Sequence, residues 1–169
     1  LEGTAIDLLI SNAGITGDFR NPAPQSFGTL DYEQWENFMR INALAGLKVA
    51  EAFTGHVKAS EDKTIVSISS FAGTFGFKGP TMPGGYWYKA SKATLNMYIK
   101  LIASDLKKDG VIVASLSPGQ VKVEKMRNVS MPGLIEPDVS ISGMISVIEG
   151  LTIEDTGTMF SHDGSRHAF

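Results

Sequence analysis

The sequence Tyr88-Lys89-Ala90-Ser91-Lys92 opens a long helical pattern that decides how this part of the chain folds. Steps of four and three residues place six side chains on one face of that helix: Tyr88, Lys92, Leu95, Ile99, Ile102 and Leu106. Four of the six are apolar, so this face is expected to turn inward against other structure. The phenol and the ammonium at its beginning are therefore expected to turn inward too.

A buried phenol one helical turn from a lysine suggests acid–base chemistry. A free tyrosine titrates near ~10. A cation about 4 Å away, at an effective dielectric constant of roughly 20, contributes about 4 kcal/mol, or about three pKa units in favour of the phenolate. The spacing thus predicts a Tyr88 pKa close to neutrality, where a proton donor and acceptor works best. The alternative is a tyrosine at an interface and a lysine that extends its ammonium to water.

Composition narrows the possible classes of protein. The 169 residues are 43% hydrophobic and 20% charged, as in a single globular domain spanning residues 1–169. The net charge of −3 gives no electrostatic reason to bind nucleic acid or an acidic membrane. Because there is no cysteine, disulfides, thiolate metal sites and cysteine nucleophiles are excluded.

Two further patterns are missing from the sequence. The histidines His56, His162 and His167 occur singly, without the spacing of metal ligands, so no metal site is expected. No apolar run approaches ~18 residues and no basic-then-apolar leader is seen, so we expect a cytoplasmic protein without a membrane partner. The first residue is Leu1, which suggests that the translated chain is longer.

The chain alternates apolar strand patterns with helical ones. Strands are expected at residues 5–10, 64–68, 111–116 and 158–160. Helices are expected at residues 32–53, after a capping Asp31, at 88–106, closed by Gly110, and at 138–149. This alternation predicts an α/β fold, a parallel sheet covered by helices on both faces.

Small polar residues follow three of the predicted strands. The strand ends read Ser11-Asn12-Ala13-Gly14, Ser69-Ser70 and Ser117-Pro118-Gly119. In a parallel sheet these ends gather on one edge, where doubly wound folds bind their ligands. The helix that carries Tyr88 begins at the same edge.

Taken in order, these stretches resemble the short-chain dehydrogenase/reductase family. The resemblance rests on Asp7-Leu8-Leu9-Ile10-Ser11-Asn12-Ala13-Gly14, on Asn42, on the strand that ends in Ser69-Ser70, on Tyr88-x-x-x-Lys92 and on Pro118-Gly119. Its wording is most similar to the C-factor-like and sniffer-like carbonyl reductases, in residues 91–97 and in the tail from Val147 to Gly164.

The resemblance implies an enzyme that transfers a hydride between a nicotinamide cofactor and a carbonyl or alcohol. Tyr88 would be the general acid or base, assisted by Lys92, while Ser70 would bind the substrate oxygen and Asn42 would position a water. The remaining assignments concern the cofactor. Residues expected along it are Asn12, Ala13, Gly14, Tyr88, Lys92, Pro118, Gly119 and Val121.

The family resemblance also bears on cofactor, partners and completeness. NAD or NADP is expected, with NADP favoured, together with a small carbonyl or alcohol substrate and a homodimer. The family's opening strand and its Gly-x-x-x-Gly-x-Gly turn are not found, so the chain is expected to hold the C-terminal portion of a three-layer, doubly wound Rossmann-type sheet. Val121-Lys122-Val123 also lacks the family's threonine.

A second interpretation therefore remains open. The chain would be a truncated or incomplete relative that keeps the catalytic groups and serves as a non-catalytic, oligomer-forming module. Its first strand would then lie at an edge of the sheet with unpaired backbone groups and exposed apolar side chains, which favours association.

Overall fold

The computed structural model describes residues 3–18, 20–76, 84–126, 128 and 130–169. Within them, five strands form one sheet in the order β1-β2-β3-β6-β7, and two short strands, β4 and β5, pair separately. The strands are β1 (Leu8–Ser11), β2 (Thr64–Ile68), β3 (Ile112–Ser117), β4 (Gln120–Val121), β5 (Leu134–Ile135), β6 (Met159–Ser161) and β7 (Arg166–His167). The helices are α1 (Glu33–Met39), α2 (Ala45–Lys58), α3 (Tyr86–Leu106) and α4 (Pro137–Glu149).

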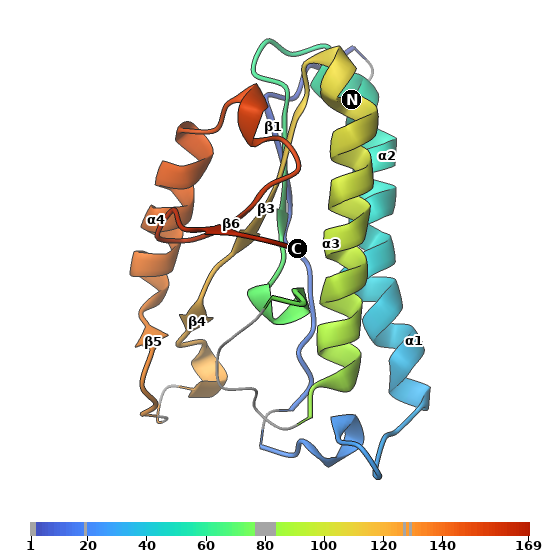
Figure 1. The fold of residues 1–169 in the computed structure, drawn as a ribbon, viewed down its shortest axis with the longest axis vertical. Helices are drawn as coiled ribbons and strands as arrows, with labels where there is room; N and C mark the ends of the chain where they lie inside the picture. The colour runs from blue at the N-terminus through green and yellow to red at the C-terminus, as the bar shows by residue number, and fades with distance from the viewer. Residues whose placement is uncertain (1–2, 19, 77–83, 127, 129) are drawn as a thin grey trace.

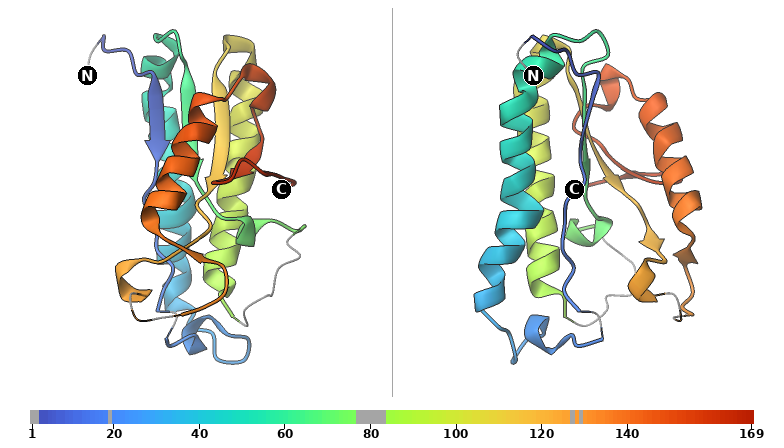
Figure 2. Two further views of the ribbon diagram at one scale, coloured as in Figure 1. Left: turned by 90° about the vertical axis from the view of Figure 1, so that its left-hand side faces the viewer. Right: turned by 180° about the vertical axis from the view of Figure 1, so that it is seen from behind.

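The helices cover both faces of the sheet. Figure 2 shows α1, α2 and α3 on one side, the strands in the middle and α4 on the other side. The strands β1, β2, β3 and β6 run parallel, while β7 turns back antiparallel to β6. The predicted three-layer α/β fold is therefore confirmed (Figure 1), although one edge strand opposes the common direction.

Each face of the sheet has its own apolar core. Neighbouring residues on a strand point to opposite faces, so Ile65 packs toward α3 and Val66 toward α4. On the first side, Leu95, Ile99 and Ala103 of α3 are buried. This double burial explains why β2 and β3 read as nearly continuous apolar runs rather than as alternating ones.

Most predicted elements are confirmed within a few residues. The strand at 64–68 is found as predicted, and α3 begins two residues before Tyr88. The predicted first strand is shorter, at Leu8–Ser11. The predicted long helix is interrupted: Arg40–Leu44 is a π-helical turn between α1 and α2, in which the Ala45 N–H donates to the Arg40 carbonyl.

Three short strands escaped prediction. The strands β4, β5 and β7 have two residues each, too few to show a period. The pair β4–β5 closes the long connection between Pro118 and Pro137, and β7 pairs with β6.

The strand β1 forms an open edge of the sheet in the described part of the chain, where β2 is its hydrogen-bonded neighbour. Leu8 and Ile10 are 39% and 45% exposed. The predicted exposure of apolar side chains at this edge is confirmed, and association through it stays a prediction. Among the described residues, no helix is both long enough and apolar enough to cross a membrane.

Candidate active site

The carboxyl ends of three parallel strands lie beside the beginning of α3. The register pairs Ser11 with Ser67 and Ser67 with Ser115, so the ends of β1, β2 and β3 reach the same edge. The Lys92 Nζ of α3 donates a hydrogen bond to the Ile68 carbonyl at the end of β2, at 3.0 Å. The expected convergence of strand ends and helix is confirmed.

Ser70 and Tyr88 meet directly at this edge. Ser70 follows β2 and caps the 3-10 helix Phe71–Gly73, since its Oγ accepts a hydrogen bond from the Ala72 N–H at 3.1 Å. The Ser70 side chain also hydrogen-bonds the Tyr88 phenol. A small oxygen atom placed between these two hydroxyls would therefore contact both of them.

Gly73 brings this 3-10 helix onto α3. A Cβ on Gly73 would lie 2.6 Å from the Ala93 nitrogen and 2.6 Å from the Lys92 carbonyl carbon, both backbone atoms that cannot rotate away. Only a glycine permits such an approach. The close packing fixes Ser70 relative to the turn of α3 that carries Lys92.

Lys92 is a buried cation, with 5% of its surface exposed. Burial lowers its pKa from 10.5 to about 8, because the charged form loses hydration. Its hydrogen bond to the Ile68 carbonyl holds the ammonium at the strand edge. Lys92 is still mostly protonated at pH 7.

The prediction for the Tyr88 pKa is wrong in direction. Burial of the phenol raises its pKa above 10.0, and the hydrogen bond with Ser70 offsets this only in part. Burial is the larger of the two causes, and the Lys92 ammonium donates its hydrogen bond to the Ile68 carbonyl rather than to the phenol. Tyr88 is therefore a protonated acid at neutral pH.

Asn42 ties three segments together from the middle of the π-helical turn. Its Oδ1 accepts a hydrogen bond from the Ile15 N–H at 2.7 Å, and its Nδ2 donates to the Ile15 carbonyl at 2.8 Å and to Ser91 Oγ at 2.9 Å. Both amide hydrogens are thus engaged within the chain. The side chain anchors the loop after β1 to α3, and its predicted role in positioning a water stays a prediction.

Asn12, Ala13 and Gly14 leave β1 as an exposed stretch beside this anchor. A Cβ on Gly14 would lie 3.3 Å from Asn42 Oδ1 and 3.5 Å from Lys92 Nζ. A bare glycine backbone next to a buried ammonium leaves room for hydroxyl groups that accept hydrogen bonds.

The Pro118–Gly119 turn follows directly on β3. Ser140 of α4 donates a hydrogen bond to the Pro118 carbonyl at 2.7 Å, and Gly119 has a positive φ of 81°. Val121 belongs to β4, paired with Ile135. The predicted cofactor residues thus follow β1 and β3, the two strands that flank β2 at one edge of the sheet, except for Val121, which lies in the separate β4–β5 pair.

Gln25 is a site residue that the sequence did not reveal. It is buried, its Oε1 accepts a hydrogen bond from the Tyr88 N–H at 3.0 Å, and its Nε2 donates to the Thr16 carbonyl at 3.0 Å. It thereby braces the first turn of α3 against the loop after β1. The contact joins residues 63 positions apart, so no local pattern announces it.

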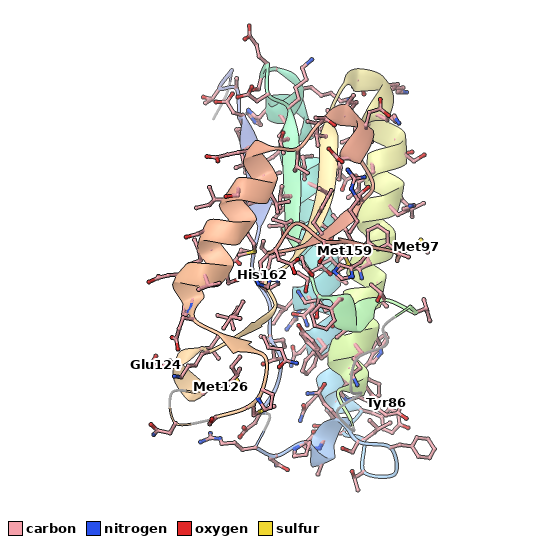
Figure 3. All side chains as sticks on the ribbon, turned by 60° about the vertical axis from the view of Figure 1, so that its left-hand side comes forward. Tyr86, Met97, Glu124, Met126, Met159 and His162 are labelled. Carbon is pink, nitrogen blue, oxygen red and sulfur yellow. The ribbon has the colours of Figure 1, made fainter. Side chains whose placement is uncertain are left out.

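The neighbouring tyrosine and the other candidates lie elsewhere. Tyr86 is exposed and stacks on Phe27 at 6.2 Å between ring centres, and Figure 3 shows it pointing outward from the beginning of α3. Met126 and Met131 lie in the connection after Pro118. The described residues contain no group of three metal-binding side chains.

Comparison with known proteins places the chain. The profile of the short chain dehydrogenase family matches residues 2–132. This chain belongs to that family. It is 31% identical to C-signal of Myxococcus xanthus over 95% of the chain and 90% of that protein. It is 32% identical to an uncharacterized oxidoreductase of Schizosaccharomyces pombe, over 95% of the chain but 66% of that protein.

Solved structures agree with this assignment. The NADPH-bound carbonyl reductase from chicken fatty liver superposes with a TM-score of 0.87 at 25% identity, covering 100% of this chain and 68% of that one. The carbonyl reductase Sniffer of D. melanogaster shares the fold, with a TM-score of 0.85 at 22% identity, covering 98% and 67%. The chain thus spans about two thirds of the length of several proteins that it matches. These likenesses support a Rossmann-fold oxidoreductase that uses NAD or NADP.

Proposed function

We propose that the protein reduces a carbonyl compound, or oxidises the matching alcohol, with Tyr88 as the general acid or base. The observation that carries this proposal is the hydrogen bond between Tyr88 and Ser70, with the buried Lys92 one helical turn further along α3. Two hydroxyl groups that converge on one point suit a carbonyl oxygen that gains negative charge and then a proton.

The chain's own residues handle the proton and the charge. When NAD(P)H is bound, it supplies the hydride that adds to the carbonyl carbon. Ser70 donates a hydrogen bond to the carbonyl oxygen, and Tyr88 transfers its proton to that oxygen as the charge develops. The raised pKa of Tyr88 keeps the proton on the phenol at neutral pH until the oxygen can take it.

Lys92 and the loop after β1 support this transfer. The Lys92 ammonium is the nearby cation that would stabilise the phenolate left behind, and Gly14 lies against the same ammonium. Asn42 holds the loop in place through Ile15. We assign the stretch Asn12–Gly14 and the turn from Pro118 to Val121 to the nicotinamide end of the cofactor.

Two features favour reduction with NADPH. A phenol whose pKa is raised is in its acid form at physiological pH, as carbonyl reduction requires. The chicken carbonyl reductase that superposes on the chain is described with NADPH bound. Oxidation would need the phenolate, and we expect it to become efficient only at alkaline pH.

Replacing Tyr88 in the full-length gene product tests the proposal. Activity on a panel of aldehydes and ketones, with NADH and with NADPH, is expected to fall about 10²-fold to 10⁴-fold in Tyr88→Phe, because the proton donor is lost while the ring remains. Tyr86→Phe is the matched control, two residues away on the same helix, and should keep activity within about twofold. Equal activity of wild type and Tyr88→Phe would exclude Tyr88 as the acid.

A second candidate is a non-catalytic, oligomer-forming module. Two observations favour it. The match covers 90% of C-signal, so a relative of about the same length exists, and β1 forms an open edge of the sheet that a second molecule could pair with. In that case the 169-residue chain would associate without binding a nicotinamide cofactor. Gel filtration and a titration with NADPH separate the two: a dilute monomer, or micromolar binding of NADPH by this chain alone, would contradict the module.

A further inference from the structure

The imidazole of His162 packs against the backbone of the Pro118–Gly119 turn. A Cβ on Gly119 would lie 3.0 Å from both Cε1 and Nδ1 of His162, and its φ of 81° favours glycine over other residues. The ring therefore contacts the bare backbone at the residue where the turn reverses. Figure 3 shows His162 at the end of β6, next to the strand that leads into this turn.

His162 is itself held from two sides. Its N–H donates a hydrogen bond to the Ser117 carbonyl at 3.0 Å, which continues the pairing of β6 with β3. On the other side, a Cβ on Gly143 of α4 would lie only 2.1 Å from the His162 carbonyl oxygen. The backbone of residue 162 is thus fixed between α4 and β3, and its ring has little freedom to leave Gly119.

The contact depends on shape rather than on a hydrogen bond. The Nδ1 of His162 is buried and has no hydrogen-bond partner among the described residues. A buried polar atom without a partner costs stability, so its position calls for another explanation. The ring fills the space behind Gly119, which a smaller side chain would leave empty.

We propose that His162 is a positioning residue that fixes the Pro118–Gly119 turn and thereby sets how tightly the nicotinamide end of the cofactor is held. The inference rests on the proposed function, in which that turn faces the cofactor. His162 acts through the turn and touches neither the transferred hydride nor Tyr88. Its loss should therefore weaken cofactor binding more than turnover at saturation.

Replacing the ring tests this directly. In the full-length gene product, His162→Ala is expected to raise the dissociation constant for NADPH about tenfold, measured by fluorescence titration, because the turn gains freedom that binding must remove. The KM for the carbonyl substrate and kcat should change by less than about twofold. His162→Phe, which restores a flat ring without nitrogen atoms, should recover most of the affinity.

A double-mutant cycle tests the contact itself. Gly119→Ala introduces a methyl group against the ring, in addition to the strain of its positive φ, and should weaken NADPH binding at least tenfold. Combined with His162→Ala, that methyl group no longer meets the ring and keeps only its contact with Ile135 Cδ1, at 3.1 Å, so the double variant should bind no worse than Gly119→Ala alone. Gly133→Ala is the control, since Gly133 has a φ of 86° in the same connection but no contact with a ring.

Thermal unfolding followed by circular dichroism identifies variants that have lost the fold, and titrations are made below their transitions. Unchanged NADPH affinity in His162→Ala, additive effects in the cycle, or His162→Phe as weak as His162→Ala would overturn this inference alone. A wild-type protein that binds neither NADPH nor NADH would overturn the proposed function, and this inference with it.

Discussion

Helix α3 buries side chains along its whole length, but its first half includes the polar residues Ser91, Lys92 and Asn96 among them, whereas its second half buries apolar ones. Ser91 and Lys92 are buried at the beginning, while Leu95, Ile99 and Ala103 are buried further along. The apolar half packs on the sheet and contributes stability. The polar half holds a cation whose pKa is lowered by burial, which costs stability. Residues that stabilise the fold and residues of the candidate site thus lie within about one turn of each other on the same helix.

The largest effect is expected from breaking the apolar half. Ile99→Ala removes a side chain that is 1% exposed and should lower the free energy of unfolding by about 2–5 kcal/mol through lost burial and the remaining cavity. Urea denaturation measures the loss. Leu101→Ala, at an exposed position of the same helix, should cost far less, and the folded Ile99→Ala protein should keep its activity. Equal costs at both positions would contradict the distinction.

The packing of the 3-10 helix Phe71–Gly73 on the polar half of α3 is tested at Gly73. The methyl group of Gly73→Ala meets backbone atoms of Lys92 and Ala93, so the 3-10 helix should move away from α3 and take Ser70 away from Tyr88. We expect about a 10²-fold loss of kcat/KM, since small misplacements of catalytic groups are costly. Gly76→Ala, where a Cβ meets nothing within 4 Å, is the control. Normal activity in Gly73→Ala would mean that Ser70 is positioned otherwise.

Removing the cation should have the opposite effect on stability. The Lys92 pKa is about 8 in the folded protein against the ordinary lysine value of 10.5, so the unfolded chain binds this proton more tightly. At pH 7 the charged lysine therefore costs the folded state up to about 3 kcal/mol, and the cost disappears as the pH rises from 8 to 10.5. Lys92→Met should abolish activity but stabilise the protein by about 1–3 kcal/mol at pH 7, less what is lost with the bond to Ile68. Equal gains at pH 7 and pH 10, by urea denaturation, would speak against burial of the charge as the cause.

The smallest effect concerns pH. Above pH 8 Lys92 loses its proton and no longer stabilises the phenolate that forms when Tyr88 gives up its own. For carbonyl reduction, kcat/KM should be level below pH 8 and fall toward about tenfold per pH unit above it. In Lys92→Arg the guanidinium stays charged, so the decline near pH 8 should disappear even if the rate is lower. A decline at the same pH in that variant would point to a different group.

The sequence was sufficient where local patterns carry the information. Periodicity located β2 and α3, because strand ends and helix faces follow from spacing. The family resemblance singled out Ser70 beside Tyr88 and Lys92, and the structure brings Ser70 and Tyr88 together, while their roles stay predictions. The sequence was insufficient where a contact joins distant residues. Gln25 beneath Tyr88 and the approach of Gly73 to α3 depend on how the chain returns on itself, which no window of sequence contains.

The predicted lowering of the Tyr88 pKa was wrong for a related reason. Spacing placed Lys92 one turn away from Tyr88, but spacing does not determine which group accepts the hydrogen bond of its ammonium. The Ile68 carbonyl at the end of β2 is that acceptor, and burial of the phenol is the larger cause that raises the Tyr88 pKa. Likewise, the π-helical turn at Arg40–Leu44 has the apolar pattern of the helix around it and only its hydrogen bonding reveals it.

That π-helical turn also limits how this region tolerates changes in length. The wider π turn accommodates one extra residue, so deleting one residue from Arg40–Leu44 would restore ordinary helical hydrogen bonding and keep α1 and α2 nearly in phase, but it would shift the side chains within the turn. Asn42 would then no longer face Ile15 and Ser91 while Val57 still faces the core. Substitutions can accumulate around this turn, whereas a single-residue deletion in it should break the hydrogen bonds of Asn42 to Ile15 and Ser91 and thereby disrupt the site.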